Sequence, residues 1–417
     1  MSAVRRFSSR TFAALSVRNF RLYFAGQLIS VSGTWMQTVA QGWLILKLTG
    51  SSVDLGVAIA LQYLPMLIFG SYGGLIADRY EKRRILYFTQ TSAGLLALVL
   101  GLLVTTHHVT VASVYVVAFV LGLVNLFDVP ARQAFVQEMV GRDLIANAVS
   151  LNSVLMNSGR VVGPGIAAGL IALVGTAACF YTNAASYLAV LLALALMRKR
   201  EFLPMKTVQR QSGQLRLGLQ YVLQTPLLRN VILATAVVGM FAFNFTTTLP
   251  LLAHTTFHQR TATQYGILMS AMGVGAIIGG LFIAHRSRPT PKLLVMLSLG
   301  FGLFMTSVAF APTLLWAEIL LVPCGAFSIA FMSSANATLQ LNSSQQMRGR
   351  VMSLYGIAFL GTTPIGAPLI GLIIAGTNPR MGLFVGALLT LVTALGLVIT
   401  LRQNLRSTET LRAASVV

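Results

Sequence analysis

Residues 74–84 read Gly-Leu-Ile-Ala-Asp-Arg-Tyr-Glu-Lys-Arg-Arg, a short charged segment between two long apolar runs. The runs cover residues 54–77 before it and 85–106 after it. Each is long enough to cross a bilayer as a helix, because about 20 apolar residues span the hydrocarbon core. A basic cluster between two such helices is expected on the cytoplasmic side. The segment therefore predicts a helical hairpin of a polytopic membrane protein.

The composition of the whole chain agrees with that prediction. Of 417 residues, 56% are hydrophobic and only 9% are charged. A soluble domain carries about 25% charged residues, so a water-soluble enzyme is excluded, and so is a disordered chain. At roughly 35 residues for a span and its loop, the length predicts about 12 spans.

Apolar runs alternate with short polar turns along the entire sequence. They predict twelve transmembrane helices, at residues 22–46, 54–77, 85–106, 110–131, 147–174, 177–197, 228–253, 262–284, 292–311, 314–338, 351–376 and 381–401.

The chain is strongly basic, with 30 Lys and Arg against 9 Asp and Glu and a net charge of +21. On a soluble chain this excess would suggest a nucleic-acid partner. Here 26 of the 30 basic residues fall in alternate loops on one side, 3 fall on the other side, and Arg160 falls within a span. Basic residues collect in cytoplasmic loops, so both termini are expected in the cytoplasm and no nucleic acid is needed as a partner.

A long hydrophilic stretch in the middle divides the spans six and six. The predicted domains are an N-terminal half at 1–197, a cytoplasmic linker at 198–227, a C-terminal half at 228–401 and a cytoplasmic tail at 402–417. Within the linker, Leu215, Leu219 and Val222 share a helical face that we expect along the membrane surface. The halves repeat weakly, residues 122–175 aligning with 325–378.

Residues 74–84 resemble the loop signature of the major facilitator superfamily, Gly-x-x-x-Asp-Arg-x-Gly-x-Arg/Lys-Arg/Lys, with Glu81 at the position of the usual Gly. The resemblance implies a conformational latch in which Asp78 pairs with a basic residue at the inner end of span four, here Arg132, and with a helix N-terminus of the other half near Val351. Simple anchoring by the basic cluster is the alternative, but it does not explain Asp78. The candidate latch residues are Gly74, Asp78, Arg79, Arg83, Arg84 and Arg132.

Span five contains Gly-Arg-Val-Val-Gly-Pro-Gly-Ile-Ala-Ala-Gly at residues 159–169, with Ala168 in place of one Gly. It resembles the signature Gly-x-x-x-Gly-Pro-x-x-Gly-Gly that exporters of this superfamily carry. The candidate exporter residues are Gly159, Gly163, Pro164 and Gly169. A generic face for close helix packing is the alternative interpretation.

Three further segments, at residues 16–27, 60–65 and 130–134, are similar to the enterobactin-exporter and macrolide-efflux branch of the superfamily. This resemblance implies an all-α membrane protein with twelve helices in two pseudo-symmetric halves. It also implies alternating access, proton-coupled export and the bacterial inner membrane.

Few ionisable residues lie within the spans. Arg160 falls near the middle of span five, where a charge costs roughly 2.5–3.5 kcal/mol on insertion scales and needs a partner or a wet cavity. Asp128 shares a helical face with Asn125 in span four and is the main candidate for the proton carrier, with Arg160 as its movable counter-charge and Glu318 as the reserve carrier. A structural ion pair is the alternative for Arg160, a purely structural role is the alternative for Asp128, and a side chain that reaches the outer membrane interface is the alternative for Glu318.

Span one carries a polar stripe of Gln27, Ser30, Thr34, Gln37 and Gln41, separated by steps of 3, 4, 3 and 4 residues. Such a stripe should face a cavity or the bundle interior rather than lipid. We expect Gln27, Thr34, Gln37 and Gln41 to line a substrate cavity, with Asn157 and Asn244 opposite. Neutral amides and hydroxyls beside aromatic rings suit a bulky amphipathic molecule better than an ion.

The sequence contains no phosphate-binding loop, hydrolase triad or metal-binding pattern, so we expect neither an enzyme nor a bound metal or cofactor. The predicted function is proton-coupled export of a drug-like or siderophore-like molecule. The expected partners are this substrate, protons and membrane lipid, and the chain is expected to be monomeric. A nutrient importer of the same fold and a non-transporting membrane scaffold or sensor remain as alternatives.

Overall fold

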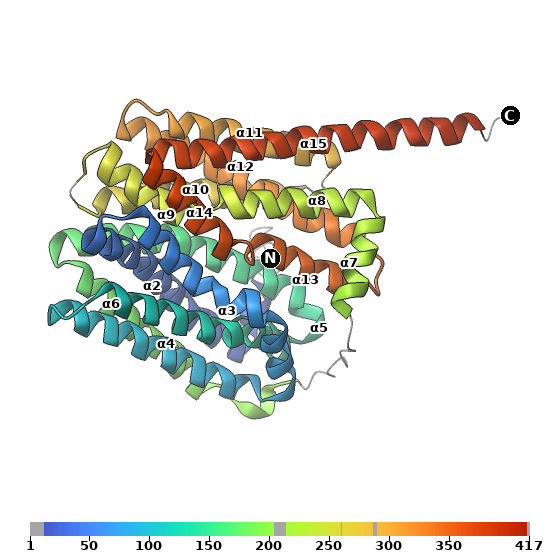
Figure 1. Cartoon of the computed structure of the whole chain (residues 1–417). Helices are drawn as coiled ribbons and strands as arrows, with labels where there is room; N and C mark the ends of the chain where they lie inside the picture. The colour runs from blue at the N-terminus through green and yellow to red at the C-terminus, as the bar shows by residue number, and fades with distance from the viewer. Residues whose placement is uncertain (1–11, 204–213, 260, 287–289, 415–417) are drawn as a thin grey trace, which may run out of the picture. The chain divides into compact units, whose positions relative to one another are not determined.

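The computed structural model describes the backbone of residues 12–203, 214–259, 261–286 and 290–414, and the side chains within these ranges except at 71–78, 142, 146, 214–215 and 400–414. The described residues form helices joined by short turns, without a strand (Figure 1). An all-α fold, as expected from the apolar runs, is therefore confirmed.

The helices follow one another closely along the chain. In order they are η1 (Ala13–Ser16), α2 (Arg18–Thr49), α3 (Ser52–Arg79), α4 (Lys82–Thr105), α5 (Val111–Leu173), α6 (Thr176–Leu196), η2 (Lys199–Glu201), α7 (Gln214–Gln224), α8 (Pro226–Val237), η3 (Val238–Ala242), α9 (Phe245–Leu251), η4 (Leu252–Thr256), α10 (Thr263–His285), α11 (Pro291–Ala309), α12 (Leu314–Leu341), α13 (Arg348–Phe359), α14 (Thr363–Gly376) and α15 (Pro379–Ala414).

Eleven helical segments in the described part of the chain are long and apolar enough to cross a membrane. They correspond to the second to twelfth predicted spans. The first predicted span is helix α2, which is long enough at 32 residues but is not among the eleven. Its run of Gln, Ser and Thr side chains makes α2 more polar than the other spans, as expected of a helix that faces a polar interior.

The region between the fourth and fifth spans differs from the sequence prediction, which placed a loop at residues 132–146. The helix instead continues to Gly141 and a new helix begins at Asp143, so that α5 joins both spans. Gly141 makes the bend with φ of 71°, a left-handed conformation that glycine adopts without strain. The extension forms because Phe135, Val136 and Met139 bury their side chains in a hydrophobic core that also contains Phe20.

The seventh and eleventh predicted spans are interrupted rather than continuous. The seventh is divided into α8, the π-helix η3, the short helix α9 and the π-helix η4. The eleventh is divided into α13 and α14 around Leu360–Thr362. The two interruptions touch, since Gly239 packs against the backbone of Phe359 and the rings of Phe243 and Phe359 lie 5.0 Å apart, edge to face.

The chain divides into two compact units. The first unit contains Met1–Gln209 with Gln259–Ser270, and the second contains Arg210–His258 with Ala271–Val417. In the first unit α2 packs against α5 and α6, and α3 packs against α5. In the second unit α11 packs against α12 and α15.

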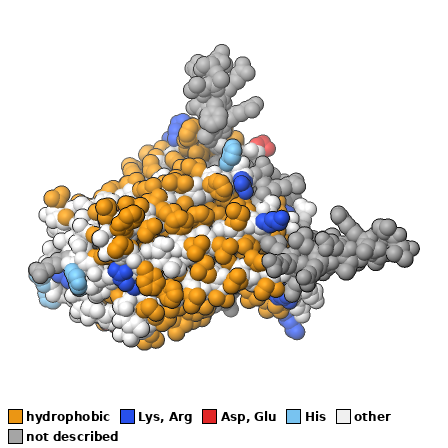
Figure 2. Space-filling view, turned by 90° about the horizontal axis from the view of Figure 1, so that it is seen from above, with side chains coloured by type: hydrophobic (Ala, Val, Ile, Leu, Met, Phe, Trp, Pro, Cys, Tyr) orange, Lys and Arg blue, Asp and Glu red, His pale blue; other side chains and the backbone are white. Residues whose placement is uncertain are grey.

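Many large hydrophobic side chains are exposed on these helices, among them Leu188, Leu192, Leu281, Leu303 and Leu395. Hydrophobic side chains cover much of the face in Figure 2, where Lys and Arg are few. Exposed apolar area of this extent is typical of a surface that contacts lipid.

Candidate functional site

The best-defined polar site in the first unit surrounds Asp128, in the first half of α5. This segment begins at a capping box, in which Thr110 and Ser113 each bond the backbone of the other. The side chain of Asp128 is buried, with 2% of its surface exposed. A buried carboxylate is stable only when donors surround it, and this one has three.

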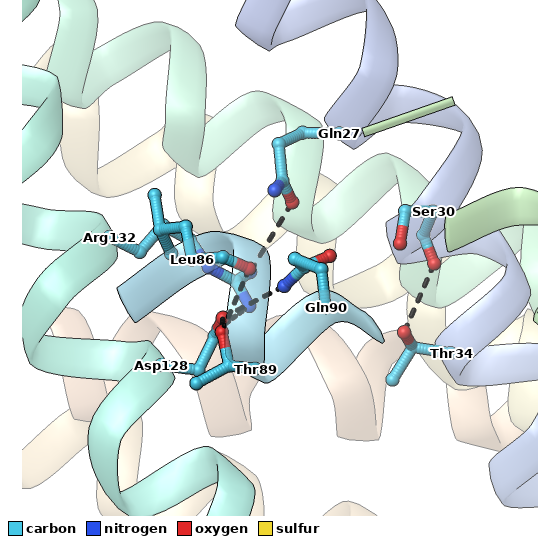
Figure 3. Close-up of polar contacts among 8 residues, drawn as sticks. All are labelled: Gln27, Ser30, Thr34, Leu86, Thr89, Gln90, Asp128 and Arg132. Carbon is cyan, nitrogen blue, oxygen red and sulfur yellow. Dashed lines mark hydrogen bonds and ion pairs between the residues drawn. The ribbon is translucent and has the colours of Figure 1, made fainter. Parts of the chain in front are cut away.

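Two of the donors come from α4 and one comes from α5 itself (Figure 3). Oδ1 of Asp128 accepts hydrogen bonds from Thr89 Oγ1 at 2.8 Å and from Gln90 Nε2 at 2.8 Å. Oδ2 of Asp128 forms an ion pair with Arg132, one helical turn further along. The site therefore joins α4 to α5 through one carboxylate.

Arg132 also connects this site to the polar stripe of α2. Its Nη1 donates to Gln27 Oε1 at 3.4 Å, which is the long end of hydrogen-bonding range. The structure thus brings three sequence-predicted residues together, namely Gln27, Asp128 and Arg132. The sequence predicted Arg132 as a partner of Asp78, whose side chain lies outside the described residues.

The network is only partly satisfied. Among the described residues, four buried polar atoms around it lack a hydrogen-bond partner: Tyr23 Oη, Gln27 Nε2, Gln90 Oε1 and Arg132 Nε. Buried polar atoms are usually paired with protein groups or with ordered water, so these four atoms are positions at which water can bind.

The polar stripe of α2 points largely into the first unit. Gln27, Ser30, Gln37 and Gln41 are buried, whereas Thr34 is exposed and its hydroxyl bonds the Ser30 carbonyl at 3.0 Å. Gln37 accepts a hydrogen bond of 2.6 Å from Asn183 of α6. Gln37 therefore also holds two helices together.

Arg160 lies in the second half of α5, and its guanidinium carbon is 4.9 Å from the ring centroid of Trp35 in α2. The nearest predicted neighbour on its own helix, Asn157, donates to the Ser153 carbonyl at 2.8 Å. Stacking on a tryptophan ring, rather than pairing with Asp128, is thus what holds Arg160.

The exporter glycines explain how Arg160 reaches α2. A Cβ atom at Gly159 would collide with Val31, and one at Gly163 would collide with backbone atoms of Ser32 and Met36. Both glycines therefore allow α5 to touch α2 on either side of Arg160. Gly169 borders open space and makes no such contact with α2, and Pro164 lies inside the helix.

The charged rim at residues 79–84 is held by several ion pairs and caps. Glu81, which stands where the signature has Gly, pairs with Arg84 at 3.0 Å and with Lys199 at 3.2 Å. Arg83 donates to the Leu194 carbonyl at 2.6 Å, at the end of α6. Arg79 is exposed, and for Gly74, as for Asp78, the surroundings are outside the described part of the chain.

In the second unit, Asn244 lies at the interruption of the seventh span. Its Nδ2 donates to the Met240 carbonyl at 2.6 Å, and its buried Oδ1 lacks a partner among the described residues. Rings of Phe243, Phe245 and Phe301 surround the interruption. Glu318 is half-buried in the second turn of α12.

Sequence reasoning missed Thr89, Gln90, Tyr23 and Asn183 as members of the polar sites. Thr89 and Gln90 are adjacent polar residues in an otherwise apolar span, and that pairing is the signal that could have placed them near Asp128.

A family model described as transmembrane secretion effector matches residues 9–416. The staphyloferrin A transporter of Staphylococcus aureus is 25% identical over 362 residues, which cover 84% of this chain and 88% of that protein. The multidrug efflux pump Tap of Mycolicibacterium fortuitum is 26% identical, covering 82% and 86%. The enterobactin exporter of Shigella flexneri is 27% identical, covering 84% of each chain.

Solved structures of transporters share the fold. A nucleoside transporter superposes with a TM-score of 0.72 at 14% identity, covering 93% of this chain and 99% of that one. A bacterial homologue of the human lysosomal transporter Spinster superposes with a TM-score of 0.69 at 14% identity, covering 94% and 95%.

Proposed function

Because this chain belongs to the transmembrane secretion effector family of the major facilitator superfamily, we propose that it is a proton-coupled secondary transporter that exports a bulky amphipathic small molecule by alternating access. Family membership makes the chain a membrane transporter rather than an enzyme. Relatives named for siderophores and drugs support the export direction and the size of the substrate. The proposed location is the bacterial inner membrane, with both termini in the cytoplasm.

The single observation that carries the proposal is the buried Asp128 carboxylate. Gradient-driven export needs a group that binds a proton in one conformation and releases it in another. Asp128 is buried in a span, and its charge depends on donors from two helices. A movement between α4 and α5 would remove donors from the carboxylate and favour its protonation.

Protonation of Asp128 would change the partner of Arg132. When Asp128 is charged, it holds the Arg132 guanidinium by their ion pair. A proton on Asp128 removes this attraction and frees Arg132 for another acceptor. We assign that role to Asp78, so that proton binding and the latch at the inner rim compete for one guanidinium.

The substrate cavity in this proposal is lined by polar side chains of several spans. Thr34 is the exposed member of the stripe on α2 and is the first residue we assign to the cavity. Gln27, Gln37 and Gln41 border it, with Asn157 as a further amide group, and Asn244 is the candidate substrate-binding amide of the second unit. Glu318 remains the reserve proton carrier.

Inverted membrane vesicles test the proposal as a whole. A panel of fluorescent drugs and siderophores is supplied outside, and the internal pH is followed with a dye after a proton gradient is imposed. If the protein is an exporter, at least one substrate should enter the lumen of the inverted vesicles, and protons should leave the lumen in exchange. Gradient-driven movement of substrate from the vesicle lumen to the outside would indicate an importer. An absence of any substrate-dependent proton flux would indicate a scaffold.

A further inference from the structure

One cation within the membrane-spanning part of the first unit has no ionic partner among the described side chains. Arg160 lies near the middle of the span Asp143–Leu173 and is half-buried. One face of its guanidinium covers the Trp35 ring.

No acid whose side chain the structure describes forms an ion pair with Arg160. The sequence contains only 9 Asp and Glu residues. Asp128 is already occupied by Arg132, Thr89 and Gln90. The described acids of the first unit outside the membrane interior are bound elsewhere or exposed: Asp54 accepts from Tyr115, Glu81 pairs with Arg84 and Lys199, Glu138 pairs with Lys82, Glu201 pairs with Arg198, and Asp143 is exposed.

The position of Arg160 is fixed by close packing. Gly159 and Gly163 flank it and seat α5 directly on α2. A cation–π contact uses no N–H donor, so the guanidinium N–H groups of Arg160 can receive a carboxylate through two parallel bonds. Among the described residues, none accepts a hydrogen bond from Arg160 in this structure.

We propose that Arg160 and Trp35 form the subsite for an anionic group, a carboxylate, of the transported molecule. This inference rests on the proposed transport function and names its substrate class as amphipathic acids. Arg160 binds the acidic group, and Trp35 holds the guanidinium in place. Arg160 is then a specificity-determining residue for the substrate rather than the counter-charge of Asp128.

A matched pair of dyes tests the subsite. Rhodamine 19 carries a free carboxylate, and rhodamine 6G is its ethyl ester. Binding of each dye to the purified full chain in phosphatidylcholine nanodiscs is measured by equilibrium dialysis, with empty nanodiscs subtracted. The wild-type protein should bind the acid about tenfold more tightly than the ester, as expected for one charged bidentate contact.

Three variants separate the contributions. Arg160→Gln should reduce the acid-to-ester ratio to about one while leaving the affinity for the ester, and Arg160→Lys should retain part of the preference because it keeps a point charge. Arg286→Gln is the control, since Arg286 also stacks on an aromatic ring, that of Phe282 at 5.1 Å. Its ratio should equal that of the wild type. Thermal unfolding of each variant checks that it is folded.

The inference is overturned if the wild type does not bind the acid, if it binds acid and ester equally, or if the preference survives Arg160→Gln. A repeat in nanodiscs that contain phosphatidylglycerol distinguishes the substrate from a lipid headgroup. If the anionic lipid displaces rhodamine 19 from the wild type but not from Arg160→Gln, Arg160 binds lipid and the substrate assignment is wrong. The vesicle transport assay reports separately on the proposed function, because it does not depend on the acid-to-ester ratio.

Discussion

The ion pair between Asp128 and Arg132 should show a strong energetic coupling. Arg132→Gln removes the cation and leaves a carboxylate that is 2% exposed with only Thr89 and Gln90 as donors. Breaking a buried pair in this way costs about 3–5 kcal/mol of folding free energy. Asp128→Asn should cost less, about 1–3 kcal/mol, because the Arg132 side chain is 21% exposed and can turn toward water.

The double variant should lose little more than the milder single variant, because neither charge is then left unpaired. The coupling energy should therefore approach the larger of the two single effects, about 3–4 kcal/mol. It is measured by reversible unfolding of the purified protein in mixed micelles as the fraction of denaturing detergent rises. The exposed pair of Arg198 and Glu201, 3.3 Å apart, is the matched control and should give a coupling of about 0–1 kcal/mol. Single effects at Asp128 and Arg132 that add within about 0.5 kcal/mol would refute this account of the site.

Three further predictions concern the packing, the latch and the cavity. Gly163→Val should destabilise the protein by about 1–3 kcal/mol, because the new side chain meets the backbone of α2. Gly169 borders open space, so Gly169→Ala should leave the unfolding temperature unchanged. Equal effects of the two substitutions would show that the contact with α2 is unimportant. Asp78→Asn should abolish transport with normal membrane insertion and increase cysteine labelling at the inner side, and unchanged transport would exclude the latch. Thr34→Ala should alter substrate preference while the protein keeps its normal abundance. Gln37→Ala should also alter substrate preference, and it should lower the free energy of unfolding by about 1 kcal/mol, because Asn183 loses its acceptor. Labelling of Gln37 by a lipid-soluble probe would show that the stripe faces lipid instead.

Most of the fold could be predicted because lipid imposes a simple rule on the sequence. A span needs an apolar run of sufficient length, and eleven of the twelve predicted runs meet that criterion in the structure. The exception, α2, was predicted as a span from the apolar run at residues 22–46, and its polar residues with helical spacing lower its hydropathy below that of the other spans. What could not be predicted are the features that depend on packing. The helix that continues past Arg132 is stabilised by burial of Phe135. The interruptions of the seventh and eleventh spans contact each other through Gly239 and the backbone of Phe359.

The candidate site was predicted in its charges but not in its partners. Asp128 and Arg132 are one turn apart on a helix, so their proximity follows from the sequence. Thr89 and Gln90 contact Asp128 from a different helix, and the rotation of that helix is not encoded in the spacing of residues along it. The same holds for Arg160, whose contact with Trp35 depends on how closely two helices approach.

Asp128→Asn, measured in two transport modes, tests whether Asp128 carries the coupled proton. Asp128→Asn is reconstituted in liposomes, and export driven by a proton gradient is compared with downhill exchange of labelled for unlabelled substrate. Glu318→Gln is measured in parallel as the reserve candidate. If Asp128 is the carrier, Asp128→Asn should lose gradient-driven export while its downhill exchange persists, and Glu318→Gln should retain both activities. Gradient-driven export that survives in Asp128→Asn but is lost in Glu318→Gln would contradict this assignment and place the proton on Glu318.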